Sequence, residues 1–120
     1  MSELHAVAHK MVEKNKGILA ADESTPTCTK RFESINTEST AESRNMYRNM
    51  LFTAKDIEKY ISGVILFDET FHQSELSSGL KIPEYLTSKN ILPGIKVDQG
   101  LENFGSKEKL TTGLDGLSER

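Results

Sequence analysis

Short apolar runs and helically spaced apolar residues alternate along most of the chain. The runs at residues 18–21 and 61–67 are too short for helices and contain almost no polar residue, so they predict buried strands. The second run is typical of a parallel strand that is covered on both faces. A third run, residues 91–97, predicts another strand, although Pro93 and Gly94 would weaken an interior position.

Helices are predicted before and between these strands. Ser2 can cap a first helix, which ends near Asn15. Thr25 followed by Pro26 marks the start of a second helix, because proline suits the first helical turn. The apolar side chains expected to share one face of this second helix are Cys28, Phe32 and Ile35.

A third helix is predicted from Ser39 and Glu42, which have the form of a capping box: a hydroxyl stands three residues before a carboxylate that can reach back. This helix would run to about residue 54. Its expected buried face consists of Met46, Tyr47, Met50 and Leu51.

The remaining segments predict a polar loop after residue 67, a short helix at residues 83–89 closed by Asn90, and a loop that runs from Asp98 to residue 112. Residues 113–120 are interpreted as the first turn of a further helix. The order strand, helix, strand, helix, strand is typical of an α/β protein with a parallel sheet.

Composition narrows the class of protein. The net charge is −3, which argues against a nucleic-acid partner, since such proteins normally carry a basic face. No apolar run approaches the roughly 18 residues of a membrane span, and Glu3, His5 and His9 interrupt any signal-peptide core. The single cysteine, Cys28, favours a reducing compartment. We therefore expect a soluble, cytoplasmic protein.

The segment after the first strand carries candidate chemistry. The strand stops at Asp22 and Glu23, and the following helix start offers hydroxyl groups, with Arg31 two turns later. A helix N-terminus favours negative charge, so this turn can bind an anion such as phosphate. The residues alone also permit a solvated turn, with Arg31 as a solvent-exposed helix residue and Glu23 as the partner of a nearby lysine or arginine.

Two further groups have both a structural and a functional interpretation. Lys96 ends the third predicted strand, and by itself it would more often pair with Asp22 or Asp98 than bind a phosphate. The run Asp68-Glu69 with His72 faintly resembles a metal cluster, but its spacing fits no closed zinc site. No metal is therefore expected.

Four long strings resemble signature segments of the class I fructose-bisphosphate aldolases, in the order in which that family has them. They are KGILAADEST (residues 16–25), SGVILFDET (62–70), GIKVDQG (94–100) and TTGLDGLSER (111–120). Several long strings in register are more specific than any single motif. The resemblance extends along almost the whole chain.

The resemblance implies a TIM (β/α)8 barrel, of which this chain would supply about the first three βα units. It implies reversible cleavage of fructose 1,6-bisphosphate into dihydroxyacetone phosphate and glyceraldehyde 3-phosphate, without metal or other cofactor. In that family a lysine forms a Schiff base with the substrate ketone, and the protonated imine stabilises the carbanion left by carbon–carbon cleavage.

The resemblance also implies roles for individual residues. Asp22 matches the aspartate that handles the C4 hydroxyl proton, and Lys96 matches a lysine that neutralises a substrate phosphate or hydroxyl. Ser24 and Thr27 match the hydroxyl positions of a phosphate pocket, and Arg31 matches an arginine at the rim of the active site. The implied catalytic residues are Asp22 and Lys96, and all five are implied to bind substrate.

This sequence departs from the family pattern in three places. Pro26 stands where the family usually has glycine, and it removes an N–H that could contact phosphate. Asp68 stands where animal members usually carry histidine. The loop at residues 101–110 is also shorter and more charged.

Length determines what is expected of the chain as given. A full barrel needs about 250 residues, so residues 1–120 are expected to be the N-terminal part of one aldolase barrel domain, ending at the start of a helix. The resemblance implies that the Schiff-base lysine lies in a later part of the barrel and not in this chain, so the 120 residues alone are expected to be inactive. The alternatives are a complete small βα module that binds phosphate without catalysis, and an aldolase-like scaffold protein.

The expected partners follow from the same resemblance. They are a sugar bisphosphate substrate and further copies of the chain, commonly in a tetramer, with no nucleic acid and no membrane. Asp115 lies in a segment that matches one forming subunit contacts in the family.

Overall fold

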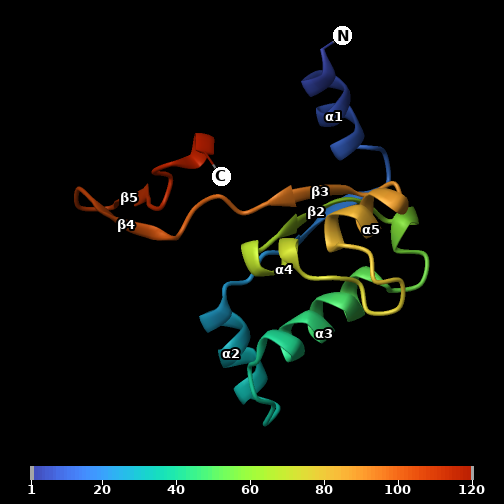
Figure 1. The fold of residues 1–120 in the computed structure, drawn as a ribbon. Helices are drawn as coiled ribbons and strands as arrows, with labels where there is room; N and C mark the ends of the chain where they lie inside the picture. The colour runs from blue at the N-terminus through green and yellow to red at the C-terminus, as the bar shows by residue number, and fades with distance from the viewer. Residues whose placement is uncertain (1, 120) are drawn as a thin grey trace.

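The computed structural model describes residues 2–119 (Figure 1). The regular elements of the first half are α1 (Glu3–Met11), β1 (Gly17–Ala21), α2 (Thr25–Glu33), α3 (Ala41–Phe52) and β2 (Ile61–Leu66). Those of the second half are α4 (Asp68–His72), α5 (Ile82–Ser88), β3 (Leu92–Ile95), β4 (Leu101–Phe104) and β5 (Glu108–Thr111). Short 3-10 turns stand at Ile57–Lys59 and Leu117–Glu119.

The three predicted strands form one parallel sheet in the order β1-β2-β3. In its register Ala21 lies beside Leu66, and Leu66 lies beside Ile95, so the three strands end at the same edge. Just past this edge the Lys96 N–H donates to the Leu66 carbonyl over 2.9 Å. The parallel α/β prediction is confirmed.

A left-handed asparagine lies in the turn that follows each of the helices α1, α2 and α5. Asn15, Asn36 and Asn90 have φ values of 66°, 52° and 60°, a left-handed conformation that asparagine tolerates better than most residues. Ser2 caps α1 by accepting from the His5 N–H over 3.3 Å. The predicted end of the short helix at residues 83–89 is confirmed by α5, whereas the first helix ends at Met11, four residues before Asn15.

The core lies between the sheet and the helices α3 and α5. Its buried members are Ala21, Phe52, Ile57, Val64, Leu66, Ile82, Leu86 and Ile91. On the sheet itself, Ile18 of β1 and Ile95 of β3 remain 46% and 42% exposed. The prediction that the strand at residues 61–67 is covered on both faces is largely confirmed, because Ser62, Gly63, Val64 and Leu66 of β2 are buried, whereas the outer strands remain partly open.

The predicted buried face of α3 is wrong for its two methionines, whereas Leu51 packs against the core as predicted and Tyr47 is half-buried. Met46 and Met50 are each 63% exposed, and the side chains buried instead are Arg48, Asn49 and Phe52. The two polar ones can be buried because each makes hydrogen bonds to the backbone. The Asn49 side chain, for example, accepts from the Leu76 N–H over 2.9 Å.

The start of α3 is shifted by one residue from the prediction. Thr40 caps the helix, and its hydroxyl accepts from the Ser43 N–H over 3.0 Å, while the Thr40 N–H donates to the Ser43 hydroxyl over 2.8 Å. Ser39 is engaged elsewhere, because its hydroxyl accepts from Arg44 over 3.0 Å. The box therefore uses two hydroxyls and not the carboxylate of Glu42.

Other differences concern short segments. The polar loop expected after β2 begins with the helix α4, and the loop expected up to residue 112 contains the hairpin β4-β5. Ile35 lies beyond the end of α2 and is 68% exposed, so it does not share the buried face of Cys28 and Phe32. The expected final helix is a 3-10 turn as far as residue 119, and residue 120 lies outside the described residues.

Candidate active site

Asp22 and Lys96 meet at the edge of the sheet where the parallel strands end. Asp22 directly follows β1, Lys96 directly follows β3, and the Lys96 Nζ lies 3.8 Å from an Asp22 carboxylate oxygen. Asp98 comes closer, with 3.1 Å between its Oδ1 and the same ammonium. The predicted proximity of the two residues is confirmed, and so is the salt-bridge interpretation of Lys96.

The electrostatics of Asp98 follow from these neighbours. The hydrogen bond from Lys96 and the N–H of Gly100, which donates over 2.9 Å, hold the pKa of Asp98 below its usual range. Lys96 therefore stands between the carboxylates of Asp22 and Asp98. Since its side chain is 27% exposed, the ammonium remains reachable by an anionic ligand.

Ser24 and Thr27 form a hydroxyl pair at the start of α2. Ser24 is the residue that precedes the helix, and the two hydroxyl oxygens lie 3.1 Å apart. Pro26 occupies the first turn, as predicted, and contributes no N–H to a ligand there. Two hydroxyls at the positive end of a helix suit a phosphate group.

One hollow is bordered by Ser24 on one side and by Lys96 and Asp98 on another, while Asp22 and Thr27 are not among its lining residues. It has a volume of about 390 Å³ and is lined by Ser24, Phe67, Lys96, Asp98, Gln99 and Gly100. The hydroxyl side of the site and its ammonium therefore border the same space. That space can hold a small anion or part of a phosphorylated sugar.

Arg31 lies in a separate cluster of charged groups. Its guanidinium forms an ion pair with Glu23 and contacts the Tyr47 hydroxyl at 3.4 Å. Tyr47 also donates to Glu23 over 3.1 Å. The expectation that Glu23 pairs with a nearby basic residue is confirmed. The side chain of Arg31 is 55% exposed, which is compatible with a place at a rim.

Arg48 is the residue of this region that the sequence did not reveal. It is only 1% exposed, and it donates to the carbonyl oxygens of Ala21 and Glu23 over 2.9 and 2.7 Å. It also lies 3.3 Å from the Glu23 carboxylate and 3.1 Å from the Cys28 sulfur. One signal existed: Arg48 and Phe52 stand four residues apart, on the side of α3 that faces the sheet.

Opposing effects set the charge of Glu23. Partial burial acts to raise its pKa, but its own backbone N–H, Arg48, Arg31 and Tyr47 together hold the pKa below its usual range. Glu23 is therefore a carboxylate at neutral pH. It balances two guanidinium groups.

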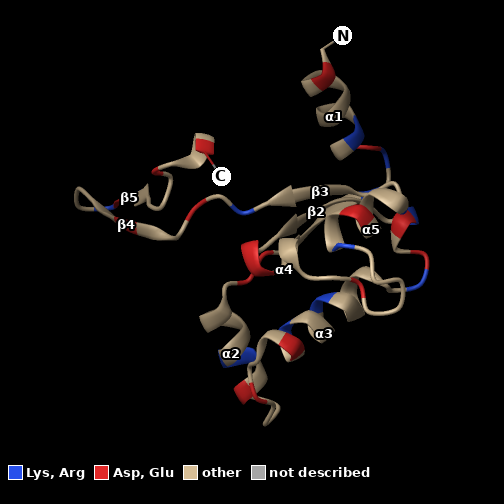
Figure 2. Cartoon of the chain, in the orientation of Figure 1, with Lys and Arg blue, Asp and Glu red and all other residues tan. Residues whose placement is uncertain are grey.

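A second ion pair ties α3 to α4. Arg44 donates to both carboxylate oxygens of Glu69, over 2.7 and 2.9 Å. This hydrogen-bonded pairing lowers the pKa of Glu69 and raises that of Arg44. Figure 2 shows basic segments on α3 and the acidic start of α4, the two elements that this pair joins.

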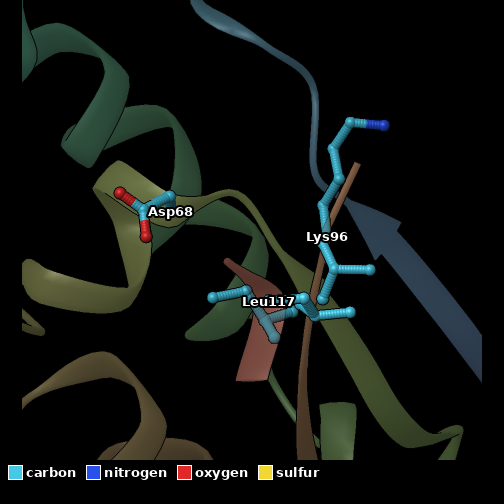
Figure 3. A pocket seen from close by; sticks show the side chains of 5 residues that line it. Asp68, Lys96 and Leu117 are labelled. Atoms are coloured by element: carbon cyan, nitrogen blue, oxygen red, sulfur yellow. The ribbon is translucent and has the colours of Figure 1, made fainter. Parts of the chain in front are cut away.

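Asp68 borders a smaller pocket of about 90 Å³ together with Lys96 and Leu117 (Figure 3). The side chains of Asp68 and Lys96 extend in different directions in this view. Asp68 instead lies 3.7 Å from His72, one turn along α4. Within residues 2–119, no group of three or more His, Cys, Asp or Glu side chains is arranged to hold a metal ion.

The described part of the chain contains no helix that is long and apolar enough to cross a membrane. Residues 3–120 match the family model described as fructose-bisphosphate aldolase class-I. The sequence is 52% identical to a fructose-bisphosphate aldolase of Plasmodium falciparum and to fructose-bisphosphate aldolase 1 of Toxoplasma gondii. Each alignment covers 98% of this chain and 33% of the relative.

A solved structure agrees with this match. It is the fructose-bisphosphate aldolase of Plasmodium falciparum in a ternary co-crystal with TRAP and a small-molecule inhibitor. Its TM-score is 0.88 at 51% sequence identity, and the match covers 98% of this chain and 34% of that one. The chain thus spans about a third of the length of the relatives it matches.

Proposed function

The chain belongs to the class-I fructose-bisphosphate aldolase family, and we propose that the protein, at the length of its relatives, cleaves fructose 1,6-bisphosphate reversibly into dihydroxyacetone phosphate and glyceraldehyde 3-phosphate. The single observation that carries this proposal is the pairing of Asp22 with Lys96 at 3.8 Å, where parallel strands end beside the hydroxyls of α2. Barrel enzymes place their active sites at this end of the strands.

In this proposal Asp22 handles the proton of the C4 hydroxyl. When the C3–C4 bond breaks, that hydroxyl becomes the aldehyde of glyceraldehyde 3-phosphate and its proton passes to the carboxylate. The electron pair of the broken bond moves toward a protonated imine that a lysine has formed with the substrate ketone. That lysine is supplied by a part of the barrel outside these 120 residues.

The other matched residues bind substrate. Lys96 leaves its carboxylate partners and pairs with a substrate phosphate or hydroxyl, and Ser24 and Thr27 donate to a phosphate. Arg31 acts at the rim, where its exposed guanidinium can approach an anion. Pro26 removes one N–H from the turn, so we expect the two hydroxyls to carry more of the phosphate contact than in relatives with glycine there.

The three parallel strands are proposed to be the first three of a (β/α)8 barrel. The likeness to the solved aldolase supports this, because it extends over nearly all of the chain. We also propose that the protein forms homo-oligomers in the cytoplasm, with the segment around Asp115 in a subunit contact. Analytical ultracentrifugation of the full-length protein tests the oligomeric state.

An activity assay with matched variants tests the function. In the full-length protein, Asp22→Asn and Lys96→Met are each expected to lower kcat/KM by about 10²-fold or more, since a positioned acid–base group contributes that much. The control is Lys59→Met, because Lys59 is an exposed lysine whose Nζ lies 3.2 Å from the exposed carboxylate of Asp56. Normal cleavage by both site variants would contradict the proposed roles.

Borohydride trapping distinguishes the full-length protein from the 120-residue chain by whether an imine forms. Borohydride with dihydroxyacetone phosphate should leave a covalent adduct on the full-length protein and none on the 120-residue chain. An adduct on the short chain would overturn the proposal that the imine-forming lysine lies elsewhere. Phosphate binding by the short chain without any turnover of the full-length protein would favour a binding module.

A further inference from the structure

Arg48 holds the backbone on both sides of Asp22. Its Nε donates to the carbonyl of Ala21 over 2.9 Å, and its Nη2 donates to the carbonyl of Glu23 over 2.7 Å. These carbonyls belong to the residues that flank Asp22 in the chain. One planar group on α3 thus fixes both neighbours of the carboxylate at the end of β1.

The surroundings of Arg48 explain how a charge can remain buried there. The Glu23 carboxylate lies 3.3 Å from its Nη2, and the Cys28 sulfur lies 3.1 Å from its Nη1. A buried ion pair of this kind is weak evidence for stability, because well-packed apolar residues often replace one without loss. Unlike an apolar side chain, the guanidinium donates hydrogen bonds to two backbone carbonyls and so holds the end of β1 in one conformation.

We propose that Arg48 is a positioning residue for Asp22, so that its two hydrogen bonds keep the Asp22 carboxylate within reach of Lys96 and of the reacting hydroxyl. This inference rests on the proposed function. Lysine cannot replace the guanidinium, since its ammonium is a single point of charge and cannot span both carbonyls in the same plane. Arg48 touches no substrate and acts only through Asp22.

Arg44 offers a matched control on the same helix. It lies one turn before Arg48 and donates to Glu69 of α4 and to Ser39, neither of which belongs to β1 or to the turn that follows it. Arg44→Lys weakens a hydrogen-bonded ion pair of α3 as Arg48→Lys does. Only the second change touches the backbone around Asp22.

The test is a kinetic double-mutant cycle in the full-length protein with Arg48→Lys, Asp22→Asn and the double variant. Arg48→Lys is expected to lower kcat about 10²-fold with little change in KM, since a misplacement of about 1 Å can cost that much. In the Asp22→Asn background the same change should cost less than about threefold, because the group it positions is already gone. Arg44→Lys should leave kcat within about twofold.

Equal losses in both backgrounds would overturn the proposal, since a purely structural role would reduce activity regardless of Asp22. A crystal structure of the Arg48→Lys variant gives a readout that needs no activity. The Asp22 carboxylate is expected to move out of ion-pair distance of Lys96, and an unmoved carboxylate would also overturn the proposal. A wild-type protein without cleavage would overturn the proposed function instead, and the crystal structure would still decide whether Arg48 holds Asp22.

Discussion

The sheet unit, residues 17–98, and the hairpin arm, residues 99–119, are ordered by different forces. Within residues 2–119, every buried residue lies in the sheet unit, and Ile91 is the last of them along the chain. In the hairpin arm every residue of β4 and β5 is exposed, and Figure 1 shows it reaching away from the sheet. Burial thus holds the first region, whereas backbone hydrogen bonds within the arm hold the second.

The hairpin arm closes on itself. The Gln99 N–H donates to the Thr112 carbonyl over 2.9 Å, and the Thr112 N–H donates to the Gly100 carbonyl over the same distance. A two-stranded hairpin without a core is marginally stable in water. The difference teaches that substitutions in the sheet unit should change global stability, whereas those in the arm should change only local opening.

The largest expected contrast is between Leu66→Ala and Leu110→Ala. Leu66 is fully buried in β2, so its truncation should lower the free energy of unfolding by about 2–5 kcal/mol. Leu110 in β5 is 47% exposed, and the same truncation there should change the free energy of unfolding by less than about 0.5 kcal/mol. Urea unfolding of both variants beside the wild type measures this. Similar losses in the two would mean that the arm is part of the cooperative core.

A smaller effect is expected from the ion pair that ties α3 to α4. Glu69→Gln removes a carboxylate that accepts two hydrogen bonds from Arg44, and it should cost about 1–2 kcal/mol. Asp56→Asn is the control, because Asp56 pairs with Lys59 on the exposed surface and should contribute less than about 0.5 kcal/mol. Equal shifts of the urea midpoint would remove the distinction between the two pairs.

The third prediction concerns acid. The pKa of Glu75 is lowered by hydrogen bonds from Ser78 and Ser77, as are those of Glu23 and Glu69 by their own partners. A carboxyl whose folded pKa is lowered stabilises the fold above its unfolded pKa, near 4.5, and that contribution is lost as pH falls through the folded value. The free energy of unfolding should therefore fall on acidification below about pH 4.5.

Two variants assign that loss to a region. Glu75→Gln should flatten the fall between about pH 5 and 3, because Glu75 is buried and its stabilising contribution then no longer titrates. Glu108→Gln in the arm should leave the fall unchanged, although the backbone N–H groups of Glu108 and Lys107 lower its pKa as well. A flatter curve for Glu108→Gln would couple the arm to global unfolding.

The smallest effect is expected at Gly105, in the turn of the hairpin. Its φ of 70° suits glycine, and an added Cβ would also meet the flexible end of the Glu108 side chain. Gly105→Ala should destabilise the hairpin by about 1 kcal/mol and speed hydrogen exchange of its amides about fivefold. Exchange in β2 should not change. Faster amide exchange in β2 as well, or unchanged exchange in the arm, would contradict this local assignment.

Sequence reasoning succeeded where one dominant force acts. The apolar run of β2 predicts a strand because burial alone decides its place, and Asp22 and Lys96 were brought together because parallel strands end at one edge. The family strings predicted the site residues before any geometry was known, and the roles of these residues stay predictions. The barrel and its Schiff base stay predictions, since they depend on residues beyond those described.

Sequence reasoning failed where a buried polar side chain makes hydrogen bonds to backbone groups that lie far away in the sequence. By residue type, Arg48 and Asn49 are expected on the surface of α3. Only the folded chain shows the backbone carbonyls to which Arg48 donates and the backbone N–H from which Asn49 accepts. The methionines were assigned to the core for the same reason, since apolar spacing cannot show which face meets the sheet. The hairpin was missed because its strands bury nothing that a pattern could show.

The hydrogen bonds of Arg48 also bear on the order in which the site assembles. They join residues only 27 and 25 positions apart, so both partners of each of these hydrogen bonds are present once the first 48 residues have been synthesised. Lys96 is made 48 residues later, which at about 5–20 residues per second is a delay of several seconds. On the ribosome, the acidic half of the site can form first and receive its lysine afterwards.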